Sequence, residues 1–264
     1  MNETLFLAAV FLTVAAVFSA LGLGGGALYV PLLLAVGVPF HHAAATSQAV
    51  IVAVAASALL VFHRAGFVDW KLVLLIEPAT DLGALLGGYL SQYIAAGVGK
   101  GIFATVMVTG AVFMLRPLPT VSREPRHGFP YWTRTLGGDT YSVNWAATVP
   151  MMVVVGFLAG LLGVGGGILK IPLLVLVSHV PIKVAVGSSA LMIGITSSMG
   201  LAGHAAAGHF DPALALPLAA AGFCGAQLGS RVSVAVDKRH LKRAFGVMLI
   251  AISFWMVFSL FRGT

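Results

Sequence analysis

The sequence predicts an all-α polytopic membrane protein made of two inverted repeats, and three observations lead to this fold class. First, 59% of the 264 residues are hydrophobic and only 9% are charged, with a mean hydropathy of +1.01. A soluble domain carries about 25% charged residues, so this composition is typical of a membrane protein. Second, a glycine-rich motif occurs twice in apolar sequence, as Gly22-Leu23-Gly24-Gly25-Gly26 and as Gly163-Val164-Gly165-Gly166-Gly167. Third, the basic residues gather in a few connections between apolar segments.

Each repeat is expected to contain a helix pair that is glycine-broken or re-entrant, followed by three spanning helices. In the first repeat, residues 1–115, the apolar stretch 5–36 would span about 48 Å as one helix, whereas the hydrocarbon core measures about 30 Å. The glycines should therefore divide it and leave a short helix over 27–37. Because Asn2-Glu3 provides no basic region, the first segment is expected to stay in the mature protein. Spanning helices are expected at 43–62, 71–92 and 99–115.

The second repeat, residues 145–264, follows the same order. At an offset of 141 residues Pro31 matches Pro172, and after one inserted residue Asp69 matches Asp211. Residues 116–144 hold arginines, prolines and glycines and are expected to form an exposed linker. The short helix and the three spanning helices of this repeat are expected at 168–178, 185–203, 212–230 and 243–261.

The basic residues decide how the two repeats are oriented. If the short helix returns to its starting side, each repeat crosses the membrane an odd number of times and the repeats are inverted. If it completes a crossing, the repeats are parallel. With Lys170 set aside, 14 of the 15 basic residues divide seven against seven in the parallel arrangement and twelve against two in the inverted one. The positive-inside rule therefore predicts inverted repeats in an inner membrane, with a cytoplasmic linker and both termini outside.

The glycine breaks are the first candidate binding site, formed by Gly24, Gly25 and Gly26 and by Gly165, Gly166 and Gly167. Non-helical backbone is tolerated within a membrane only where protein or a water-filled cavity surrounds it. A helix that begins at Ala27 or Ile168 would direct free N–H groups and a positive dipole end towards the membrane centre. Such broken helices mark transporter sites at repeat interfaces. The alternative is that the glycines only allow close helix packing.

Lys170 lies three residues after Gly167, within Ile168-Leu169-Lys170-Ile171-Pro172. A cation on the first turn of the short helix would add directly to an anion site. The alternative is that its side chain extends to the membrane interface, as lysine readily does. Its repeat counterpart is Tyr29, so the predicted site is asymmetric.

Glu77 and Asp81 are the acids deepest within a predicted spanning helix. Four residues apart, they share one helix face, where two carboxylates repel and at least one is expected to stay protonated near neutral pH. This arrangement suits proton coupling, because acids within a membrane are functional candidates. The alternative is that they pair with a buried cation or hydroxyl that holds the helices together.

Two hydroxyl-bearing runs occupy matched positions, Thr46-Ser47-Gln48 in the first repeat and Ser188-Ser189 in the second. They could donate hydrogen bonds to an anion or bond back to helix carbonyls. Arg231 ends a predicted spanning helix on the cytoplasmic side, where it is either a topology anchor or part of a substrate vestibule.

Other function classes find little support. The single Cys224 excludes an intramolecular disulfide and a cysteine metal cluster. The eight histidines lie mostly near predicted helix ends and no HExxH motif occurs, so we expect neither a metal nor another cofactor. No GxSxG motif is present, and we expect no enzyme. The net charge of +7 reflects topology, because no basic run with interleaved aromatic residues indicates nucleic-acid binding.

At the repeated motifs the chain resembles the TauE/SafE family of sulfite exporters, a family of membrane anion permeases. The resemblance covers nearly the whole chain except the linker. It implies two repeated halves that move small sulfur-containing or carbon-containing anions across the inner membrane. Ser188-Ser189 departs mildly from the expected Thr-Ser but keeps a hydroxyl. The residues that carry the resemblance are Gly22 to Gly26 with Pro31, Gly163 to Gly167 with Pro172, 45–48, 187–190, Gly83-Ala84 with Gly87, and Gly225-Ala226 with Gly229-Ser230-Arg231.

The sequence thus predicts a secondary transporter that moves a small anion, such as sulfite or an organosulfonate, by proton-coupled alternating access. Export is implied by the resemblance alone. A passive anion channel is the first alternative, and an intramembrane metal-dependent enzyme is the second. The expected partners are the anion, protons and the lipid bilayer, and the sequence leaves open whether the chain forms a homo-oligomer.

Overall fold

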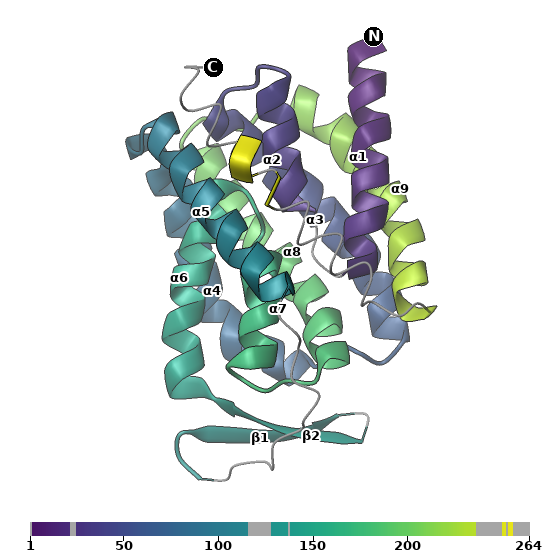
Figure 1. The fold of residues 1–264 in the computed structure, drawn as a ribbon, viewed down its shortest axis with the longest axis vertical. Helices are drawn as coiled ribbons and strands as arrows, with labels where there is room; N and C mark the ends of the chain where they lie inside the picture. Colours follow the sequence, from purple (N-terminus) through teal and green to yellow (C-terminus); the bar gives the residue numbers. More distant parts are fainter. Residues whose placement is uncertain are drawn as a thin grey trace.

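Helices form nearly all of the structure, a computed structural model in which α1 begins at one end and a β-hairpin lies at the other (Figure 1). Six of the described helices are long and apolar enough to cross a membrane. The predicted class of polytopic helical membrane protein is therefore confirmed. The structure describes residues 2–21, 25–115, 128–136, 138–235, 250–251 and 253–255.

The first repeat contains the predicted helices within a few residues of their expected bounds. The long apolar stretch is divided at the glycines, because α1 ends at Leu21 and the ten-residue α2 begins at Gly26. Ten residues rise about 15 Å, half the thickness of a hydrocarbon core. The elements are α1 (Asn2–Leu21), α2 (Gly26–Ala35), α3 (Phe40–Arg64), α4 (Trp70–Leu90) with the 3-10 turn η1 (Ser91–Tyr93), and α5 (Ala96–Leu115).

The second half repeats this order. A long helix ends at Leu162, and a ten-residue helix follows from Gly167. The predicted helix 243–261 lies mostly outside the described residues. The elements are α6 (Trp145–Leu162), α7 (Gly167–Leu176), α8 (Ile182–Ala206) and α9 (Pro212–Ala235).

The linker differs from the exposed loop that its composition predicts. Its described part is an antiparallel hairpin of β1 (Tyr131–Leu136) and β2 (Asp139–Asn144), in which Tyr141 and Val143 are buried. The segment Gly137-Gly138 stands between two runs rich in Thr, Tyr and Val, which is a hairpin pattern that the sequence already contained. Residues 116–127 lie outside the described part.

Matched glycines bring the helices of the two repeats together. A Cβ on Gly83 of α4 would collide with the carbonyl oxygen of Val153 of α6. A Cβ on Gly225 of α9 would collide in the same way with Leu12 of α1. Both partners are repeat counterparts, so α4 packs on α6 as α9 packs on α1. Close backbone approach through small residues is a common basis of helix packing in membranes.

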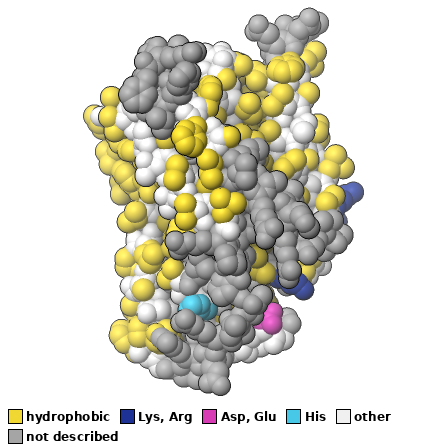
Figure 2. All heavy atoms as spheres, in the orientation of Figure 1, with side chains coloured by type: hydrophobic (Ala, Val, Ile, Leu, Met, Phe, Trp, Pro, Cys, Tyr) yellow, Lys and Arg dark blue, Asp and Glu magenta, His cyan; other side chains and the backbone are white. Residues whose placement is uncertain are grey.

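The outer surface is suited to lipid. Figure 2 shows a face on which hydrophobic side chains predominate, while the few visible charged side chains lie at its right edge and lower part. Leu74 of α4, 73% exposed, and Leu216 of α9, 64% exposed, are two of many large hydrophobic side chains on the surface. Extensive exposed apolar surface marks contact with a membrane or a protein. Lys170, Glu77 and Thr196, which are described below, are instead buried between helices.

Candidate functional site

The two glycine breaks meet inside the protein. Gly25 and Gly166, which directly precede α2 and α7, have φ values of 88° and 77°, in the left-handed region that favours glycine. A Cβ on Gly26 would lie 2.6 Å from the carbonyl oxygen of Val164, so the first break packs against the backbone of the second. Ile51 of α3 contacts both breaks. Gly24 lies outside the described residues.

Neither short helix has a side-chain cap among the described residues. Both begin one residue earlier than expected, at Gly26 and Gly167. The first N–H groups of a helix lack intrahelical partners, so these helix starts retain donors for another acceptor. Together with the helix dipole they favour negative charge at the point where the breaks meet.

Lys170 of α7 lies beside this point and is fully buried. Its Nζ donates to Glu77 Oε1 of α4 at 2.6 Å and to Thr196 Oγ1 of α8 at 2.6 Å. The Thr196 hydroxyl donates to Glu77 Oε2 at 2.8 Å and approaches Asp81 Oδ1 at 3.4 Å. Glu77 is 3% exposed, so one positive and one negative charge are held together away from solvent.

This cluster changes the interpretation of its members. Lys170 does not extend to the membrane interface, because it forms an ion pair with Glu77. Glu77 and Asp81 share the predicted face, and both approach Thr196. Thr196 was not among the predicted site residues, although it lies with Ser197 and Ser198 in otherwise apolar sequence. Their roles in binding and coupling stay predictions.

The side chains of the two matched hydroxyl-bearing runs mostly form hydrogen bonds with backbone groups. Ser47 Oγ donates to the carbonyl of Gly163 at 2.6 Å, and Gln48 Nε2 donates to the carbonyls of Ala159 and Gly160. These bonds join α3 to the last turn of α6 and to Gly163, which directly follows it. Thr46 Oγ1 is buried and has no hydrogen-bond partner among the described residues.

In the second repeat, Ser188 Oγ accepts from the backbone N–H of Asp69 at 2.9 Å, and Ser189 Oγ donates to the carbonyl of Val186 at 2.8 Å. Both hydroxyls are buried in α8. The predicted binding role of Ser188 and Ser189 therefore competes with these structural bonds.

Arg231 lies away from the breaks. It lines a surface cavity of about 230 Å³ between α3 and α9 together with Leu60, Val61, Arg64 and Gln227. Two arginines at one cavity suit an anion or a lipid phosphate. The anchor and the vestibule interpretations of Arg231 therefore both stay open.

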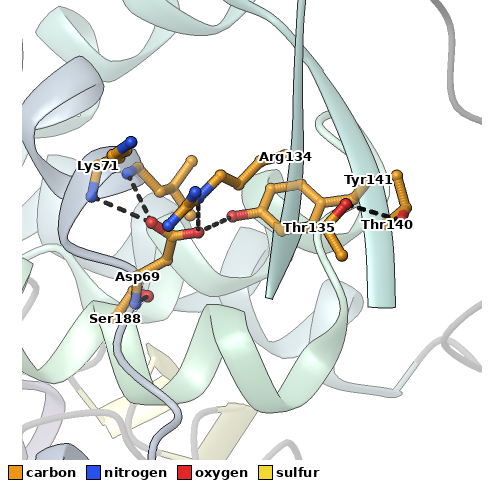
Figure 3. Close-up of polar contacts among 8 residues, drawn as sticks. Asp69, Lys71, Arg134, Thr135, Thr140, Tyr141 and Ser188 are labelled. Carbon is orange, nitrogen blue, oxygen red and sulfur yellow. Dashed lines mark hydrogen bonds and ion pairs between the residues drawn. The ribbon is translucent and has the colours of Figure 1, made fainter. Parts of the chain in front are cut away.

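A second polar cluster joins the hairpin to the helices (Figure 3). The buried carboxylate of Asp69 caps α4 by accepting from the N–H groups of Lys71 and Leu72. It also accepts from Arg134 Nε at 3.0 Å and from the Tyr141 hydroxyl at 2.8 Å. Burial, and then the hydrogen bond to Asp69, raise the pKa of Tyr141. In the sequence, Asp69 stands out only as the repeat match of Asp211.

Four histidines gather at the start of α3 and the end of α8. The ring of His209 stacks on His41 with centroids 4.9 Å apart and lies edge-on to His42 and His204. Burial lowers the pKa of His209, and the neighbouring charges of His41 and His42 lower it further. The expectation that the histidines bind no metal stays a prediction.

Six apolar helices, two glycine breaks and a buried charge cluster define a polytopic helical membrane protein with a polar centre. This is the class in which transporters bind their substrates near the midplane. Within that class, the family model of the sulfite exporter TauE/SafE matches residues 6–256, so the chain belongs to that family. The resemblance stated from the sequence motifs is confirmed.

Curated relatives support the same class. "Probable membrane transporter protein YunE" of Bacillus subtilis is 28% identical over 91% of this chain and 92% of its own length. A "Probable membrane transporter protein" of Xylella fastidiosa is 29% identical over 90% of this chain and 88% of its own. No solved structure matches the chain. The chain is a membrane transporter, and its family points to a small anion as substrate.

Proposed function

We propose that the chain is a proton-coupled secondary transporter that exports a small oxyanion, such as sulfite or an organosulfonate, across the inner membrane. The observation that carries this proposal is the buried Lys170–Glu77 ion pair beside the start of α7. A cation aligned with a helix N-terminus favours an anion. The Glu77 carboxylate competes with the anion for that cation, and protonation of the carboxylate would remove this competition.

Coupling follows from this competition. While Glu77 is ionised, it neutralises Lys170, and the ion pair offers an anion no net attraction. Protonation of Glu77 frees the Lys170 ammonium for the substrate, and the Thr196 hydroxyl keeps both groups in place. Substrate release returns Lys170 to Glu77, which gives up its proton. Asp81 lies one turn further along α4 and is the second candidate for this proton.

In this scheme the proton and the anion bind together and move in the same direction. A dianion with one proton carries a net charge of −1. An inside-negative membrane potential drives such a charge outwards by about 2.3 kcal/mol per 100 mV. Export of a sulfite dianion is therefore compatible with proton co-transport, and the concentration gradients set the net direction.

Alternating access is proposed to arise from two inverted repeats. In Figure 1, α1 runs from the N-terminal end towards the hairpin, whereas α6 starts beside the hairpin and runs the opposite way. The short α2 lies nearer the N-terminal end and α7 nearer the hairpin. These directions support re-entrant short helices. The charge distribution of the sequence supports a cytoplasmic linker and an outward-facing start of α1.

Proteoliposomes with purified protein test this function. Uptake of labelled sulfite, sulfate and a sulfonate is measured with and without an imposed pH gradient. We expect saturable flux of at least one of them, accelerated when protons are more concentrated on the side of the substrate. Flux indifferent to the pH gradient and nonsaturable would indicate a passive channel, and turnover of substrate without a membrane would indicate an enzyme.

A further inference from the structure

Two buried hydroxyls at the breaks lack partners among the described residues. Tyr29 and Ser197 are both 0% exposed, yet neither Tyr29 OH nor Ser197 Oγ has a hydrogen-bond partner there. Buried polar side chains are nearly always hydrogen-bonded. An unpartnered hydroxyl in an apolar core is costly unless a ligand or water completes it.

Tyr29 is directed at the first break. It lies four residues after Gly25, on the first turn of α2, and its ring stacks on Phe11 of α1 with centroids 4.7 Å apart. Its hydroxyl oxygen lies 2.5 Å from the point where a Cβ on Gly25 would stand. The stacked ring therefore fixes the hydroxyl at the buried start of α2, where only glycine leaves room for it.

Ser197 is directed at the second break. Its Oγ lies 2.9 Å from the point where a Cβ on Gly165 would stand. The preceding residue, Thr196, bonds the Lys170 ion pair, so α8 presents one hydroxyl to the charges and the next one to the break. A serine in a helix commonly bonds back to a carbonyl one turn earlier, as the exposed Ser198 does with Gly194. Ser197 makes no such bond.

We propose that Tyr29 and Ser197 are substrate-binding residues, each donating a hydrogen bond to a different oxygen of one bound anion. This inference rests on the proposed function and adds which side chains recognise the oxygen atoms of the anion. The first break supplies a neutral donor, and the second supplies a neutral donor beside the Lys170 cation. Gly26 packs against Val164, which places the two breaks side by side, as one shared anion requires. Such a site favours a polyoxygen anion of the sulfite or sulfonate type over a halide, which has a single acceptor centre.

The test compares Tyr29→Phe and Ser197→Ala with two controls in which an exposed hydroxyl is lost, Tyr93→Phe and Ser198→Ala. Binding of sulfite and of bromide to the purified proteins is measured by titration calorimetry in oxygen-free buffer. A hydrogen bond to a charged group is worth roughly a tenfold change in affinity or more. We expect each site variant to weaken sulfite binding about tenfold or more, while bromide binding and the two controls change less than about twofold.

Thermal unfolding without ligand separates binding from a structural role. Loss of an unpartnered hydroxyl should leave the melting temperature unchanged or raise it. A lowered melting temperature, or sulfite affinity within about twofold of wild type, would overturn the inference while the transport function stands. If the wild type binds none of sulfite, sulfate or a sulfonate, the proposed function itself fails.

Discussion

The two glycine breaks have the same backbone and different chemistry. Each places a left-handed glycine, Gly25 or Gly166, directly before a ten-residue helix. Four residues later the first repeat has the neutral Tyr29, whereas the second has the charged Lys170. The repeated residues thus build the geometry of the site. Residues private to one repeat supply its charge, since Glu77 also has no acidic counterpart at the matched position 219.

The matched turns before α4 and α9, which lie at opposite ends of the molecule, differ as well. Asp69 is 1% exposed and its backbone N–H donates to Ser188 Oγ, which joins α4 to α8. Its counterpart Asp211 is exposed, and Thr46, the counterpart of Ser188, has no partner among the described residues. One end is closed by a contact that the other end lacks. Such an asymmetry between matched repeats is what alternating access would exchange.

The largest effect is expected when the second break is made as neutral as the first. Lys170→Met should abolish transport and weaken sulfite binding more than a hundredfold, because the cation is the main attraction for the anion. Proteoliposome flux and calorimetry measure this. The substitution also leaves Glu77 buried without its partner, at a cost of about 3–5 kcal/mol if that group stays charged.

A paired variant removes that complication. Lys170→Met/Glu77→Gln keeps a neutral, hydrogen-bonding centre and should fold, as judged by monodisperse behaviour in detergent, while transport stays absent. Lys183→Met, which removes an exposed lysine at the start of α8, should transport as wild type. Transport by the double variant would show that the asymmetry of the breaks is not the basis of binding.

The second prediction concerns Glu77, which competes with the substrate for Lys170. Glu77→Gln should leave Lys170 permanently available, so binding of a sulfonate, whose own charge does not change with pH, becomes independent of pH. In the wild type, binding of the same sulfonate should weaken as the pH rises, because ionised Glu77 retains Lys170. Titration calorimetry at several pH values distinguishes the two proteins, and flux of the variant should no longer respond to a pH gradient. An unchanged pH dependence would indicate that Asp81, and not Glu77, binds the coupled proton.

These residues show what a single sequence can and cannot predict. Long hydrophobic runs fixed the helices to within a few residues, and the glycine clusters predicted both breaks, because these features are local. The shared face of Glu77 and Asp81 follows from helix periodicity. Lys170, the partner of Glu77, is 93 positions away from it, so this contact depends on the packing of α4, α7 and α8, which periodicity alone does not give.

The hairpin was missed although its pattern is local. Its turn residues and β-branched strand residues are present in the sequence, but the proline- and glycine-rich composition of the linker suggested a loop. The contact of Arg134 with Asp69 spans 65 positions and was not predictable. Buried polar clusters of this kind depend on tertiary structure, because each partner alone would be too costly to bury.

The third prediction compares the two ends directly. Asp69→Asn should still cap α4, since asparagine is also a good N-cap residue. It should nevertheless destabilise the protein by about 2 kcal/mol, because Arg134 and Tyr141 lose a charged acceptor. The matched Asp211→Asn should stay within about 0.5 kcal/mol of wild type, as exposed substitutions usually do. Thermal unfolding in detergent measures both, and equal losses would remove the proposed difference between the ends.

The smallest effect concerns the hairpin side of that comparison. Tyr141→Phe should cost about 1 kcal/mol at neutral pH, because one hydrogen bond to Asp69 is lost. In the wild type the raised pKa of Tyr141 means that its contribution is fully present below about pH 10, the usual value for tyrosine, and is lost as the pH rises above it. Unfolding curves between pH 8 and 11 should therefore converge for the variant and the wild type. Tyr93→Phe, which alters an exposed ring, should follow the wild type throughout, and a constant gap between Tyr141→Phe and wild type would contradict the role of the buried hydroxyl.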